Sequence, residues 1–131
     1  MKRTTILTLV LILGVAVGVA LAKGPAAAKA TTIEGTLVDT KCYFADAANK
    51  SNDHGPVKGC GTMCAKADSP VGILTTAGKH YPLVVPAPAV AEQVGQTVRA
   101  TGTVREGSFV PTKLEMKKGN NWQEIKFGSS K

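Results

Sequence analysis

From Thr31 onward, apolar and polar residues alternate with a period of two, and this pattern limits the chain to a mainly β fold. Strands that bury one face and expose the other have this alternation. It is clearest in 97–106, where threonines and arginines separate Val98, Ala100, Gly102 and Val104. The pattern predicts strands near 32–40, 71–76, 80–85, 97–106 and 108–117, and a weaker strand at 122–127.

The order of these strands favours a small OB-like barrel of five to six strands, similar to the oligonucleotide/oligosaccharide-binding type. One short helix is predicted between strands three and four, near 87–95, because Val90 and Val94 are one helical turn apart and Gly95 follows them. A barrel of this type has its helix at that point in the strand order. An open β-meander with a helix is the alternative. The expected core consists of Leu37, Ile73, Leu83, Val98, Val104 and Leu114.

A cysteine-bearing insertion, 41–70, follows the first strand and contains all three cysteines of the chain. Its first part is rich in polar, small and turn-forming residues, which is typical of a loop. The stretch "CGTMCAKA" then predicts one or two helical turns that end before Pro70. On such a helix Cys60 and Cys64 share a face, and we expect both to point toward Cys42 at the end of the first strand.

Three kinds of chemistry are compatible with this insertion. A metal site would use Cys42, His54, Cys60 and Cys64, whose three thiolates and one imidazole suit zinc or cuprous copper. In an oxidising compartment, Cys42 would instead form a disulfide with Cys60 or Cys64 and leave one thiol free. Thiol redox cycling is the third interpretation, although its usual spacing is C-x-x-C rather than C-x3-C. We expect a small binding module that holds zinc or copper; the alternative is a disulfide-stapled envelope or interaction domain without metal.

Two polar residues outside this set are ambiguous. Asp39 lies three residues before Cys42, where it can cap the turn that leaves the first strand or orient a metal ligand. A single histidine at the start of a strand, such as His80 beside Tyr81, is typical of a partly exposed surface residue.

The chain resembles small exported bacterial domains of unknown function over most of its length after the N-terminal segment. Their pattern is a G-x-hydrophobic-x-D-x-x-C segment, a histidine, a C-x3-C pair and a later strand that contains T-G-T-V. The matching residues are Gly35, Asp39, Cys42, His54, Cys60, Cys64 and Gly102. The step from His54 to Cys60 is longer than the H-x-x-C step of the pattern. The resemblance implies a barrel-like fold and an exported location, and it implies no established activity.

Residues 1–22 have the composition of a signal peptide. Lys2 and Arg3 precede an apolar run of seventeen residues, and small residues allow cleavage after Ala22 or after Ala30. Seventeen residues are at the lower limit for a spanning helix, so an uncleaved anchor is the less favoured alternative. We expect an exported protein, periplasmic or secreted, with a flexible tail at 23–30 and a single domain at 31–131.

The charge and the aromatic residues of the chain indicate which binding partners are expected. Removal of Lys2 and Arg3 lowers the formal net charge from +7 to +5. The aromatic residues are few and scattered, so no stacking surface for nucleic acid is expected, whereas a weak contact with an anionic envelope surface is compatible with the charge. No serine–histidine–acid set, carboxylate pair or phosphate-binding loop is recognisable, so no enzyme activity is predicted.

Overall fold

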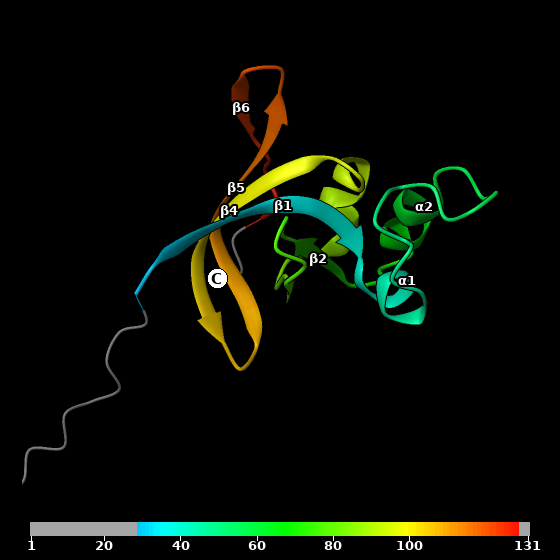
Figure 1. The fold of residues 1–131 in the computed structure, drawn as a ribbon. Coiled ribbons are helices and arrows are strands. Elements are labelled where there is room, and N and C mark those ends of the chain that lie inside the picture. Colours follow the sequence, from blue (N-terminus) through cyan, green and yellow to red (C-terminus); the bar gives the residue numbers. More distant parts are fainter. Residues whose placement is uncertain (1–28, 129–131) are drawn as a thin grey trace, which may run out of the picture.

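The computed structural model describes residues 29–128, which form one antiparallel sheet of six strands with short helices beside it (Figure 1). The spatial order of the strands is β3-β2-β1-β4-β5-β6. Their bounds are β1 Thr31–Asp39, β2 Val71–Leu74, β3 His80–Pro82, β4 Thr97–Arg105, β5 Ser108–Lys118 and β6 Asn121–Glu124. The predicted signal peptide, 1–22, and residues 23–28 of the predicted tail lie outside the described residues.

The helices lie in two places along the chain. The α-helices α1 (Thr40–Ala45) and α2 (Cys60–Lys66) both belong to the cysteine-bearing insertion between β1 and β2. Between β3 and β4 the chain forms a 3-10 helix, η1 (Ala87–Gln93), where one short helix was predicted. The helix placement differs from the prediction in α1, which the sequence pattern does not predict, whereas α2 matches the helical turns expected at "CGTMCAKA". The helix η1 has 3-10 rather than α geometry and has a proline in its first turn. No helix among residues 29–128 is long and apolar enough to cross a membrane.

The first strand holds the sheet together because it pairs with two partners. Its first part, Thr31 to Thr36, runs antiparallel to β4, and its second part, Thr36 to Asp39, runs antiparallel to β2. Gly35 lies where the strand changes partner, and a Cβ built there would be 2.2 Å from the carbonyl oxygen of Leu74. Only a glycine allows this approach of the two backbones.

The hydrophobic core lies between the sheet and η1. Leu37, Ile73, Val98 and Leu114 are fully buried, as predicted, and Leu83 is 8% exposed. Val90 and its neighbours in η1 close the core from the side of the helix. The chain just after β3 also approaches the start of β5. Leu83 and Phe109 form an isolated parallel bridge there, and the Val84 N–H donates to the Phe109 carbonyl at 2.9 Å. The six strands nevertheless form an open sheet.

The prediction that Val104 is buried is wrong, since this side chain is 44% exposed. A β-bulge between Thr101 and Gly102 shifts the register of β4 against β5, and the hairpin beyond it extends past the rest of the sheet (Figure 1). The bulge also changes which residues of β5 face inward, so that Phe109 is buried. The alternation of the sequence does not reveal a bulge, because a bulge inserts an extra residue into one strand only.

Candidate metal centre

Cys42 is positioned by the cap of α1. Asp39 is the last residue of β1 and the N-cap of α1. Its Oδ1 accepts a hydrogen bond from the Cys42 N–H at 2.7 Å. The Cys42 carbonyl accepts from the Asp46 N–H at 3.0 Å and from Asn49 Nδ2 at 3.1 Å, which closes the single turn. A short helix with both ends satisfied in this way holds its third residue in one orientation.

A histidine anchors α1 to the sheet. The His80 ring stacks on Tyr43 with centroids 5.3 Å apart and meets Phe44 edge-on at 4.9 Å. Its Nε2 lies 3.3 Å from the Thr40 hydroxyl. The ring also covers Gly72, where a Cβ would lie 2.3 Å from Nε2. Burial lowers the pKa of His80, so the ring is neutral at pH 7.

Cys60 and Cys64 are positioned by α2, whose first backbone N–H groups are capped by Asn52 from the preceding loop. Asn52 Oδ1 accepts from the Thr62 N–H at 2.7 Å, and the Asn52 carbonyl accepts from the Gly61 N–H at 2.9 Å. Ala65, which follows Cys64 in the helix, is fully buried in the core. This packing leaves the cysteine face of α2 turned toward α1.

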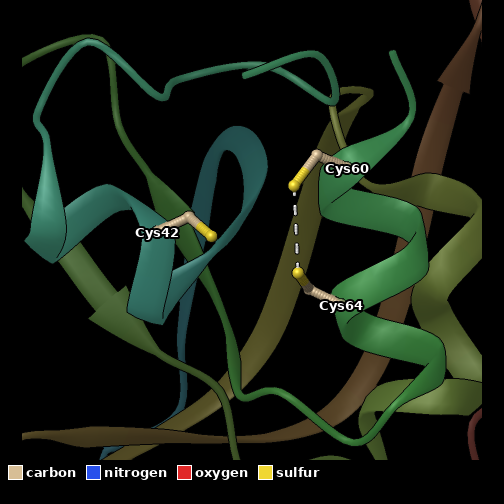
Figure 2. A group of neighbouring side chains, drawn as sticks. All are labelled: Cys42, Cys60 and Cys64. Carbon is tan, nitrogen blue, oxygen red and sulfur yellow. Dashed lines mark hydrogen bonds between the residues drawn. The ribbon is translucent and has the colours of Figure 1, made fainter. Parts of the chain in front are cut away.

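The three cysteines meet between the two helices (Figure 2). Their sulfur atoms all lie within 4.8 Å of one another, and those of Cys60 and Cys64 are 4.0 Å apart. Each cysteine is partly buried and free, so the predicted disulfide alternative is not formed. Ligands about 2.3 Å from one tetrahedral ion would be slightly closer, about 3.7 Å apart. The group is therefore close enough to hold a metal ion after a small contraction.

Two thiols in this group, those of Cys42 and Cys64, have raised pKa values. Burial raises the pKa of the Cys42 thiol to about 12, with smaller contributions from the negative charge of Asp39 and from Cys64. Burial also raises the pKa of Cys64, and Cys60 and Asp39 act in the same direction. Both thiols are protonated at neutral pH, so they are weak nucleophiles until a cation displaces the protons.

His54, the fourth predicted ligand, is not part of this group of mutually close ligand atoms. It is 9% exposed, and its Nε2 lies 3.2 Å from the Ser51 carbonyl oxygen. Its Nδ1 is buried without a hydrogen-bond partner. The structure thus brings together the three cysteines and leaves the histidine in the preceding loop, paired with Val57 through the backbone.

Two residues that position the site were not identified as such from the sequence. The sequence pattern indicates a partly exposed surface position for His80 and gives no signal for Asn52. Neither has a local signal, because His80 lies 40 residues from Thr40 and Asn52 lies 10 residues from Thr62. Asp39, in contrast, has the spacing to Cys42 of a helix N-cap, which the sequence does contain.

Comparisons of the chain with protein-family models, with curated proteins and with solved structures found no match. The functional argument therefore depends on the geometry of the site.

Proposed function

We propose that this protein is a small exported binding module that holds a soft metal ion, zinc or copper, through Cys42, Cys60 and Cys64. The observation that carries the proposal is the meeting of three free sulfur atoms, from two separate helices, within 4.8 Å of one another. Thiolates are the preferred ligands of both zinc and cuprous copper. The sequence also predicts His54 as a ligand, but His54 is not among the mutually close ligand atoms, so the proposal rests on the three cysteines alone.

The location and shape of the protein belong to the same proposal. The composition of residues 1–22 supports export to the periplasm or the medium, where the basic residues would make at most weak contact with an anionic envelope surface. The bridge between Leu83 and Phe109 supports a partly closed, OB-like barrel that places the insertion at one end.

The proposal is tested by mass spectrometry of the exported protein, native and denatured, together with thiol counting. We expect one metal ion per chain in the native spectrum and three thiols that react only after a chelator is added. The proposal is wrong if the protein purified without reductant contains no metal, has one free thiol and is about two daltons lighter than its reduced mass. These results indicate a disulfide.

A further inference from the structure

Asp39 is a buried carboxylate that lacks a counter-charge. The residue is fully buried, and its Oδ1 is used by the Cys42 N–H. Its Oδ2 is also buried and has no hydrogen-bond partner. None of the ion pairs among residues 29–128 includes Asp39. A buried carboxylate oxygen in this state is costly, because Oδ2 has lost its hydration without gaining a cation or a hydrogen-bond donor.

Asp39, whose Oδ2 has no partner, is adjacent to the helix that supplies one sulfur atom of the cluster. Asp39 directly precedes α1, and it is linked through its other oxygen to the backbone of Cys42. Its negative charge also acts on the thiols of Cys42 and Cys64, which lie on different helices. The carboxylate therefore lies at the start of α1, next to the helix that carries Cys42.

On the basis of the proposed metal site, we infer that Asp39 supplies the fourth ligand through Oδ2 and thereby selects a divalent ion such as zinc over cuprous copper. Zinc accepts a carboxylate oxygen at about 2.0–2.2 Å beside thiolates at about 2.3 Å. Oδ1 keeps its bond to the Cys42 N–H, so the ligand stays oriented by the helix cap. Asp39 is not among the mutually close ligand atoms, so the inference requires its Oδ2 to move inward when the ion binds.

The charge balance gives the selectivity. Three thiolates and one carboxylate carry four negative charges, of which a divalent ion neutralises two and a monovalent ion only one. Cuprous copper also prefers soft sulfur ligands and gains little from a hard carboxylate oxygen. A carboxylate buried beside the thiols therefore favours zinc and is unfavourable for cuprous copper.

The variant that separates these effects is Asp39→Asn, which keeps the capping oxygen but removes the charge and the carboxylate ligand. The matched control is Asp46→Asn, because Asp46 is an exposed carboxylate at the other end of α1. Binding of zinc(II) chloride and of a cuprous acetonitrile complex is measured for each protein by competition with a chromophoric chelator. We expect Asp39→Asn, which loses a direct ligand, to weaken zinc binding by at least about 100-fold and to leave copper binding unchanged or stronger. Asp46→Asn should match the wild type for both metals.

The outcomes distinguish this inference from the proposed function. If the wild type binds neither metal, the proposed function is wrong, and this inference falls with it. If the wild type binds zinc and Asp39→Asn binds it equally well, only the role of Asp39 is wrong. Should Asp39→Asn fail to fold, crystals of the zinc-loaded wild type decide the question. Asp39 Oδ2 at about 2.0–2.2 Å from zinc supports the inference, and His54 or water in that position overturns it.

Discussion

At the scale of single residues, the site depends on sulfur atoms that two helices bring together. Cys42 comes from α1, and Cys60 and Cys64 come from successive turns of α2. None of the three is fully buried, so an ion and the protons that it displaces have a path to solvent. This exposure separates the group from a structural core of buried cysteines.

Replacement of Cys42 or Cys64 by serine is expected to weaken zinc binding by at least about 100-fold, because the loss of a ligand exceeds the effect of losing an outer partner. Competition titration with a chelator gives the affinities. Met63→Leu is the control, since Met63 is 55% exposed on the same helix. Equal zinc affinities for Cys42→Ser and Met63→Leu would contradict the proposed ligand set.

Zinc binding is expected to become tighter as the pH rises. The pKa of Cys42 is raised to about 12 and that of Cys64 is also raised, so both thiols carry a proton at neutral pH. The ion displaces at least these two protons, and the association constant therefore rises by at least about 100-fold per pH unit between pH 6 and 8. Chelator competition at several pH values measures this slope. An affinity independent of pH would exclude thiolate ligation.

At the scale of the elements, short helices are held by capping and by packing rather than by their own propensity. Helices of six and seven residues are too short to be stable alone. The helix α2 packs on η1, and Lys66 and Glu92 form an ion pair of 2.6 Å between them. The position of the cysteines therefore depends on side chains outside both helices.

Asn52→Ala is expected to lower the free energy of unfolding by about 0.5–2 kcal/mol, because α2 loses the oxygen that caps the Thr62 N–H. Zinc affinity should fall with it, since Cys60 lies in the same first turn. Urea unfolding and zinc titration provide the two measurements. Asn52→Asp keeps an acceptor oxygen and is the control; if it behaves like the alanine variant, the cap is not the cause.

The ion pairs of Glu115, with Arg99 on β4 and Lys113 on β5, predict that stability depends on pH in the acid range. Arg99, followed by Lys113, lowers the pKa of Glu115 from 4.5 to about 2. Because the folded pKa is depressed, the stabilisation is present above the unfolded pKa and is lost as the pH falls from about 4.5 toward 2.

We expect Glu115→Gln to be less stable than the wild type at pH 7 and to approach it at pH 2–3. Urea midpoints at pH 7, 5 and 3 test this convergence. Glu106→Gln, at an exposed turn, is the control and should follow the wild type throughout. A constant difference between Glu115→Gln and the wild type at all three pH values would show that the pair does not carry the effect.

At the scale of the whole molecule, one core joins the sheet to η1 and so supports the insertion. The most informative residue is Phe109, the largest of the fully buried side chains, which also forms the bridge to Leu83. Val104 pairs with it across the hairpin but is exposed. Substitutions at these two positions therefore distinguish the contribution of core packing to stability from that of strand formation in the hairpin.

Phe109→Ala is expected to lower the free energy of unfolding by about 3–5 kcal/mol, because it leaves a cavity in the core. Val104→Ala should change it by less than about 0.5 kcal/mol, as expected for an exposed position. Chemical denaturation of both variants at pH 7 measures the difference. A loss of similar size in both would mean that Val104 is buried and that the hairpin folds onto the core.

The sequence by itself determined the strands, their order along the chain and the clustering of cysteines in one insertion, because period-two alternation and residue spacing are local properties. The capping position of Asp39 could be predicted for the same reason, since a cap acts over three residues. Only the tertiary structure decided the bulge that turns Phe109 inward, the exposure of Val104, the role of His80 under α1, and the separation of His54 from the sulfur atoms. These features arise from contacts between residues far apart in the chain, where sequence spacing carries no information about distance.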